Sequence, residues 1–191
     1  MTKKKNRLII PMLIVLALAA VFLAVRFMKN RPVTPASSDP VPRKYTLKDL
    51  DSLERTENFA DGTLEHIFNG TVNSSGNGSG YHYDMIEDSD GYIVEGTRSE
   101  KDEYGVYTAN IEVSGKKKSH YSTFFPDEWS PQEVVDAINA AREDAMANNR
   151  KVDSLWIGYY EGIEIDMYMT KKGKITTAYP VYITERTKID D

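Results

Sequence analysis

The chain has 191 residues and no cysteine, which excludes disulfides, cysteine nucleophiles and cysteine metal sites. Its formal net charge is −5, but residues 44–191 carry 16 basic and 28 acidic side chains, a net charge of −12. Such an acidic region is not held to nucleic acid by general phosphate neutralisation. Any chemistry on nucleic acid therefore requires a local site, in a region long enough to build its own hydrophobic core.

The N-terminal residues 1–29 have the pattern of a membrane anchor. A basic cluster precedes an uncharged apolar run at residues 8–25, close to the roughly 20 residues that span a bilayer. No small-x-small cleavage site follows, which favours a retained anchor over a cleaved signal peptide. Because the basic cluster before the run is the denser one, we expect a single-pass protein of the bacterial cell membrane with the C-terminal domain extracellular.

Residues 30–43 contain four prolines, which predict an extended linker. The domain is then expected over residues 44–191. It begins with a predicted helix over residues 44–60, in which Thr46 is the N-cap and Asp49 its capping-box partner. Strands are predicted at residues 92–97 and 105–113, where turn signals and alternating side chains occur.

A second helix is predicted to begin after Ser130, because Pro131 and Glu133 complete a strong helix start, and to end near Asn148. Residues 155–160, 163–169 and 175–184 then predict three strands in meander order. The expected fold class is α+β: antiparallel sheets with an N-terminal helix and one mid-chain helix, preceded by a single transmembrane helix.

His66 and His82 lie on either side of a segment rich in Gly, Ser and Asn, residues 73–80. This segment is too poor in bulky side chains to pack, so it predicts a loop that folds one histidine back beside the other. Histidine titrates near neutrality, and two of them can supply a base and an acid together. Spacing alone also fits two surface or core histidines without a chemical role.

Two other functions are compatible with the residues. Tyrosine-rich strands could form the surface of an anchored, non-catalytic binding module, because tyrosine provides contact area at low entropic cost. A metal-dependent hydrolase is less well supported, since the carboxylates after His82 resemble an acidic turn and lack histidine-rich ligand spacing. The cluster Lys116, Lys117 and Lys118 is interpreted as a solvated turn, which we favour over a phosphate contact. We assign no role to His120.

Four stretches together resemble the bacterial EndoU nuclease family: HIFNG (66–70), GYHY (80–83), STFFPDEWSPQEVVDAINAA (122–141) and GKITTAYPVY (173–182). The resemblance covers residues 64–182 and keeps the order of the motifs. It implies metal-independent cleavage of RNA, without a cofactor, by attack of the 2′-hydroxyl on the adjacent phosphate. The products would be a 2′,3′-cyclic phosphate and a 5′-hydroxyl.

The resemblance also implies the site residues. His66 and His82 would carry the protons, in an order that the sequence leaves open. The mechanism also needs a third group, which donates to the charged oxygens of the phosphorane. In eukaryotic relatives this group is a lysine, whereas in many bacterial members a Thr and a Tyr near the last strand take its place. We therefore assign this role to Thr177 and Tyr179, which alternation places on one face of a strand; Lys174 is a substitute close in sequence.

The implied partners are an RNA substrate, the membrane through the N-terminal anchor and, for a toxin, a dedicated immunity protein. Because only a short anchor and linker precede the domain here, a membrane-tethered extracellular ribonuclease fits equally well. A catalytically inactive binding module on the same fold is the alternative. The oligomeric state stays open.

Overall fold

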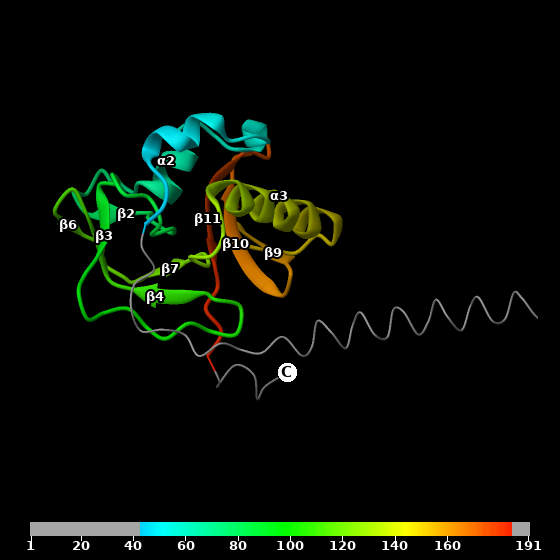
Figure 1. Ribbon diagram of the computed structural model, residues 1–191. Coiled ribbons are helices and arrows are strands. Elements are labelled where there is room, and N and C mark those ends of the chain that lie inside the picture. Colours follow the sequence, from blue (N-terminus) through cyan, green and yellow to red (C-terminus); the bar gives the residue numbers. More distant parts are fainter. Residues whose placement is uncertain (1–42, 185–191) are drawn as a thin grey trace, which may run out of the picture. The chain divides into compact units, whose positions relative to one another are not determined.

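The computed structural model describes residues 43–184 (Figure 1). Within them, short 3₁₀ helices precede two α-helices and eleven strands, and every pairing between these strands is antiparallel. The helical elements are η1 (Leu47–Ser52), η2 (Thr56–Asn58), α2 (Thr63–Phe68) and α3 (Pro131–Ala147). The strands are β1 (Thr71–Val72), β2 (Gly78–Ser79), β3 (Gly91–Ile93), β4 (Tyr107–Ala109), β5 (Ile111–Val113), β6 (Lys116–Lys117), β7 (Ser122–Phe124), β8 (Lys151–Val152), β9 (Leu155–Tyr160), β10 (Ile163–Met169) and β11 (Ile175–Pro180).

The largest sheet is the predicted meander, with strand order β11-β10-β9-β8. Ile163, Ile165 and Met167 alternate toward the buried face of β10, as a half-buried strand requires. Helix α3 lies against this sheet (Figure 1). The helix approaches β9 so closely at Gly158 that a Cβ there would lie 1.9 Å from the carbonyl oxygen of Ala141.

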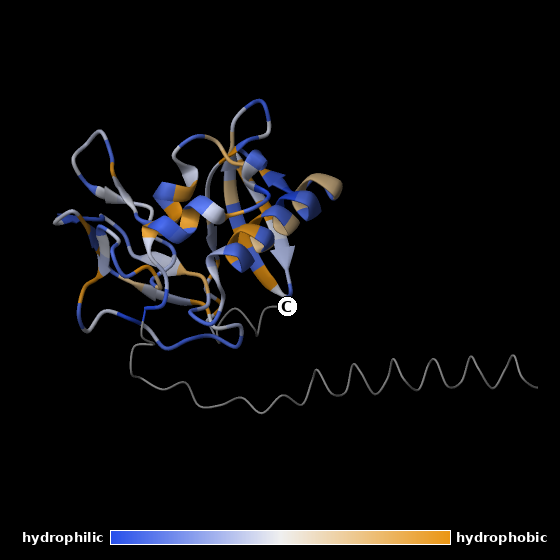
Figure 2. Ribbon diagram, turned by 45° about the horizontal axis from the view of Figure 1, so that its top comes forward, coloured by the Kyte–Doolittle hydropathy of each residue, from blue (hydrophilic) through white to orange (hydrophobic). Residues whose placement is uncertain are grey.

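Helix α3 begins as the sequence predicts. The Ser130 hydroxyl accepts a hydrogen bond from the Glu133 amide, and the Glu133 carboxylate accepts one from the Ser130 amide. Hydrophobic residues recur along the helix between hydrophilic ones (Figure 2), and Val134, Ile138 and Ala141 are fully buried. The apolar side of the helix therefore covers one face of the sheet.

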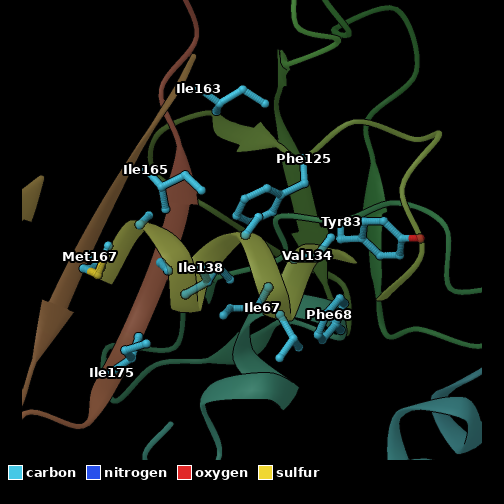
Figure 3. Close-up of a cluster of buried hydrophobic side chains, with 14 of the residues drawn as sticks. Ile67, Phe68, Tyr83, Phe125, Val134, Ile138, Ile163, Ile165, Met167 and Ile175 are labelled. Atoms are coloured by element: carbon cyan, nitrogen blue, oxygen red, sulfur yellow. The ribbon is translucent and has the colours of Figure 1, made fainter. Parts of the chain in front are cut away.

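The hydrophobic core has two parts. The main cluster lies between α2, α3 and the large sheet, and Figure 3 shows Phe125 and Ile165 within it, close to Ile138. A second cluster contains Tyr81, Tyr107 and Phe124, and it joins the strands β4, β5 and β7. Adjacent residues belong to different clusters, Phe124 to the second and Phe125 to the main one, so β7 ends where the two clusters meet.

The predicted helix over residues 44–60 is wrong. Asp49 does accept hydrogen bonds from the Thr46 amide and hydroxyl, but the segment forms only η1 and η2, separated by extended Leu53 and left-handed Arg55. No residue of η1 is buried. Its leucines Leu47 and Leu50, and Leu53 after it, are only partly buried against the main cluster, whereas most helices in proteins are stabilised by tertiary packing of an apolar face.

The α+β class with antiparallel sheets is observed, but two expectations attached to it need correction. Across residues 43–184 we find no helix with the length and apolar character to cross a bilayer, and the span predicted at residues 8–25 lies outside this range. The transmembrane helix in the expected fold class is therefore not supported. Neither is the expected location as a single-pass membrane protein with an extracellular domain.

Candidate functional site

His66 lies in the last turn of α2, where its backbone and ring meet the returning chain. The His66 carbonyl accepts a hydrogen bond of 2.9 Å from the Tyr81 amide, and the His66 Nδ1 lies 2.9 Å from the Thr71 hydroxyl. Gly80 allows this approach, because a Cβ there would lie 2.1 Å from the His66 carbonyl oxygen. Its φ of +72° also favours glycine.

His82 is held between the two parts of the core. Its amide donates to the Ile67 carbonyl, and its own carbonyl accepts from the Phe125 amide. Tyr81 is buried in the second cluster and Tyr83 in the main one, so the histidine lies where the clusters meet. The ring centroids of His66 and His82 are 6.4 Å apart, and the loop between them therefore folds as predicted.

The imidazole of His82 has a defined tautomer. Its Nδ1 lies 2.8 Å from the backbone carbonyl oxygen of Thr123, and a carbonyl can only accept, so Nδ1 carries the proton. In the neutral ring Nε2 is then an acceptor. The partner of the His66 Nδ1 is a hydroxyl, which can donate or accept, so that contact leaves either tautomer open.

The last strand of the meander contributes two residues to the same place. Tyr179 stacks on His82 with the ring centroids 5.4 Å apart and the planes 24° from parallel. Thr177 lies two residues earlier on β11, and both side chains line one cavity with His66 and His82. The structure thus brings together all four site residues that the sequence analysis named.

Lys118 is a site residue that the sequence analysis missed. Its Nζ donates to the Gly80 carbonyl oxygen at 3.2 Å and to the Ser122 hydroxyl at 2.7 Å, and its side chain lines the cavity. Lys116 and Lys117 are exposed, as a solvated turn predicts. In the sequence Lys118 follows two other lysines. Because the three side chains have the same chemistry, the sequence does not show which of them turns into the cavity.

The cavity has a volume of about 650 Å³, within the range of small-molecule and cofactor sites. His120, Tyr121, Thr123 and Asp166 also line it, so His120 is near the candidate site although exposed. Lys174 is not among the lining residues. Its amine donates to the Glu57 carbonyl, so it does not take the place of Tyr179 or Thr177.

Burial and charge set the protonation of the site. Burial lowers the pKa of His82 well below its ordinary value and that of His66 to a lesser degree, and the positive charge of Lys118 lowers both further. Burial also lowers the pKa of Lys118 to about 8 and raises that of Tyr179 to about 12. Near neutrality the cavity therefore holds neutral imidazoles, a mostly protonated lysine and a phenol that retains its proton.

The described residues do not form a metal site of the usual kind. In the part of the chain that the structure describes, no group of three or more His, Asp or Glu side chains is arranged to hold a metal ion. The groups gathered in the cavity can instead exchange protons and donate hydrogen bonds to an anion. The fold and the site together define an α+β protein with a candidate acid–base centre.

A family model described as "Bacterial EndoU nuclease" matches residues 61–182. This match covers more than half of the chain, and it contains His66, His82, Lys118, Thr177 and Tyr179 of the cavity. The chain belongs to the bacterial EndoU nuclease family, as the motifs predict.

The chain is also similar to a curated protein named "Toxin" from Bacillus cereus. The two are 40% identical over 137 residues, which make up 69% of this chain and 24% of that protein. The chain thus spans about a quarter of the length of the curated relative it matches.

Proposed function

We propose that the protein is a metal-independent endoribonuclease in which the 2′-hydroxyl of RNA attacks the adjacent phosphate. The observation that carries the proposal is the defined tautomer of His82. With Nδ1 donating to the Thr123 carbonyl, Nε2 is free to accept the 2′-hydroxyl proton, so we assign His82 as the general base. DNA lacks this hydroxyl, which restricts the substrate to RNA.

His66 then serves as the general acid. Attack of the 2′-oxygen forms the bond to phosphorus while the bond to the 5′-oxygen breaks, and His66 gives its proton to that leaving oxygen. The acid must be an imidazolium at this step. A bound phosphate offsets the charge of Lys118, which is one cause of the low pKa of His66, and so favours protonation of the ring.

The charge that develops on the phosphorane requires hydrogen-bond donors. Lys118 supplies a protonated amine held by the Gly80 carbonyl and the Ser122 hydroxyl. The Tyr179 phenol retains its proton because burial raises its pKa, and Thr177 lines the same cavity. Donors fixed in advance in a partly buried site stabilise such charge strongly. The products are a 2′,3′-cyclic phosphate and a 5′-hydroxyl.

A role as a toxin is supported by the similarity to the toxin-named protein of Bacillus cereus. In that role the nuclease would act on the RNA of another cell, and the producing cell would need an immunity protein that blocks the cavity. Expression of the chain with and without inactivation of the site, followed by growth and RNA integrity, tests this role.

The activity itself is tested with the purified full chain and total RNA in the presence of EDTA. We expect new RNA ends that carry cyclic phosphate and 5′-hydroxyl groups. His66→Ala and His82→Gln should each lower the rate about 10²- to 10⁴-fold, while circular dichroism shows that both variants fold. A folded wild type that cleaves no RNA, with or without Mn²⁺, would favour the non-catalytic binding module.

A further inference from the structure

A second hollow, of about 470 Å³, lies between the end of α3, the β8–β9 hairpin and the turn that joins β10 to β11. Among the described residues, its lining includes no acidic side chain but four basic ones: Arg142, Lys151, Lys171 and Lys172. The surrounding region of the chain has a net charge of −12. None of the residues that line this basic hollow lines the histidine cavity.

Arg142 differs from the other arginines of residues 43–184. Those others each form an ion pair with a carboxylate: Arg43, Arg55, Arg98 and Arg150. Within the same residues Arg142 forms none; its Nε donates to the Gly173 carbonyl oxygen at 3.2 Å, which holds the guanidinium beside the β10–β11 turn. A carbonyl group has no net charge, so the positive charge of Arg142 is left for a ligand. A guanidinium held in place is a fork of donors that matches a phosphate or a carboxylate.

Part of the lining is apolar, which favours a nucleotide over an acidic side chain as the ligand. Trp156 and Met169 line the hollow and pack against the main hydrophobic cluster. The Lys151 amine lies 5.3 Å from the centroid of the Trp156 ring. Cations beside an aromatic ring are typical of sites for single-stranded nucleic acid, because the cations meet the phosphates and the ring meets a base. The volume also falls in the range of small-ligand sites.

On the basis of the proposed function, we propose that the basic hollow is a second RNA-binding site, which holds backbone phosphates of the substrate away from the cleavage site. Arg142 binds one phosphate through its free N–H groups, and the three lysines neutralise the neighbouring phosphates. Trp156 contacts the nucleotide between them. The acidic remainder of the region repels RNA, so the hollow supplies attraction that Lys118 alone does not.

The two sites lie on different faces of the main sheet. Trp156 pairs with Met167, which is buried on the face that α3 covers. Tyr179 pairs with Asp166, the adjacent position of β10, and adjacent positions of a strand face opposite ways. An RNA that occupies both sites therefore passes around the β10–β11 turn, where Lys171 and Lys172 are exposed. The second site thus acts only on RNA that is long enough to make this passage.

The test compares cleavage of a dinucleotide, which fills only the histidine cavity, with cleavage of an RNA of about 20 nucleotides by the full chain. Lys171→Met/Lys172→Met should raise KM for the long RNA at least about 10-fold, with kcat and all dinucleotide kinetics unchanged. Lys48→Met/Lys116→Met is the matched control. It removes two exposed lysines that line neither site, and it should leave KM unchanged for both substrates.

Binding is measured directly by fluorescence anisotropy of the long RNA. Every protein in this series also carries His66→Ala, so that the RNA stays intact. Arg142→Gln and the variant of the two turn lysines should each weaken binding at least about 10-fold, and the latter should reduce the slope of log K against log salt by about 1.4. Urea unfolding verifies that each variant is folded. Polyglutamate of the same length, added as a competitor, should displace the RNA poorly.

The possible results separate this inference from the proposed function. Binding that depends on the turn lysines, in a wild type that cleaves no RNA, would refute the proposed function and support the second site. Cleavage of the long RNA with the same KM in the turn variant and in the control would overturn the second site and leave the proposed function intact. Displacement of the RNA by polyglutamate at an equal or lower concentration would also overturn it, because the hollow would then bind an acidic protein segment.

Discussion

The phenol ring of Tyr179 stacks on the imidazole of His82, with the ring centroids 5.4 Å apart. The first residue comes from the last strand of the sheet, and the second from the segment that follows the Gly-rich loop. The contact therefore joins the sheet to the histidine pair. It also places Tyr179 among the residues that line the cavity of the two histidines.

Tyr179→Phe separates the two roles of this residue. The ring and its stacking on His82 stay, but the hydrogen-bond donor is lost, so we expect kcat to fall about 10²-fold while the free energy of unfolding changes little. Tyr179→Ala should lose activity and stability together. Single-turnover cleavage and urea unfolding of both variants check this. Full activity of Tyr179→Phe would show that the hydroxyl does not act on the phosphorane.

The pH profile of kcat/KM should have its maximum below pH 6.5. The base must be neutral and the acid protonated, so the maximum lies between two histidine pKa values that burial and Lys118 both lower. Lys118→Met removes the charge that contributes to the shift. It should raise both pKa values, move the maximum to higher pH and lower the rate about 10²- to 10³-fold.

Lys116→Met is the matched control for that substitution, because Lys116 is exposed and lies outside the cavity. Its pH profile should superimpose on that of the wild type. Titration of the His66 and His82 ring resonances by NMR reports the pKa values directly. Equal profiles for the two lysine variants would contradict the electrostatic role of Lys118.

Burial of His82 also predicts how stability depends on pH. The pKa of His82 is lower in the folded protein than the unfolded value of about 6.5, so the unfolded chain binds more protons. The contribution of His82 to the free energy of unfolding is complete above pH 6.5. It is lost as the pH falls below this value, by up to about 1.4 kcal/mol per pH unit. His82→Gln should remove most of this slope in urea unfolding between pH 7.5 and 5. If the free energy of unfolding changes with pH in the same way in the wild type and in His82→Gln, the explanation from the burial of His82 is contradicted.

Two glycines with nearly the same φ provide a test of the contact that holds His66. Gly80→Ala would place a Cβ 2.1 Å from the His66 carbonyl oxygen and 2.8 Å from its Nδ1. Gly76→Ala, at φ +78°, meets nothing within 4 Å. Gly76→Ala should cost only the backbone strain, about 1–2 kcal/mol. Gly80→Ala should cost more and lower cleavage at least about 10-fold, because His66 must move. Equal effects in thermal unfolding and cleavage would refute the steric explanation.

The cap of α3 is a purely structural site and should affect stability alone. Ser130→Ala removes the acceptor for the Glu133 amide and should lower the free energy of unfolding by about 1 kcal/mol. Ser130→Asp retains a capping oxygen and should restore most of the loss. Both variants should cleave RNA at the wild-type rate, since Ser130 does not line the cavity. A loss of cleavage in Ser130→Ala without unfolding would contradict this division.

The features that depend on neighbouring residues could be predicted from the sequence. The cap and apolar spacing of α3, the alternation of the last strands and the Gly-rich loop between His66 and His82 all act over a few residues, and all appear in the structure. The family motifs indicated the two histidines, Thr177 and Tyr179, which lie around one cavity in the structure. None of these features requires knowledge of which distant segments meet.

Residues of the same type differ in environment through contacts that form only in the folded chain, and the sequence does not show these contacts. Lys118 differs from Lys116 and Lys117 because the Gly80 carbonyl, far away in the chain, accepts from its amine. Asp166 is one of 28 acidic residues after residue 43, and the folding of β7, β10 and β11 around one cavity sets it apart. The segment of residues 44–60 shows the converse, since its capping signal is present but its leucines are only partly buried against the core, and it forms 3₁₀ turns in place of an α-helix. Burial and desolvation depend on contacts between distant segments, and these contacts determine which polar groups of the chain can act on a substrate.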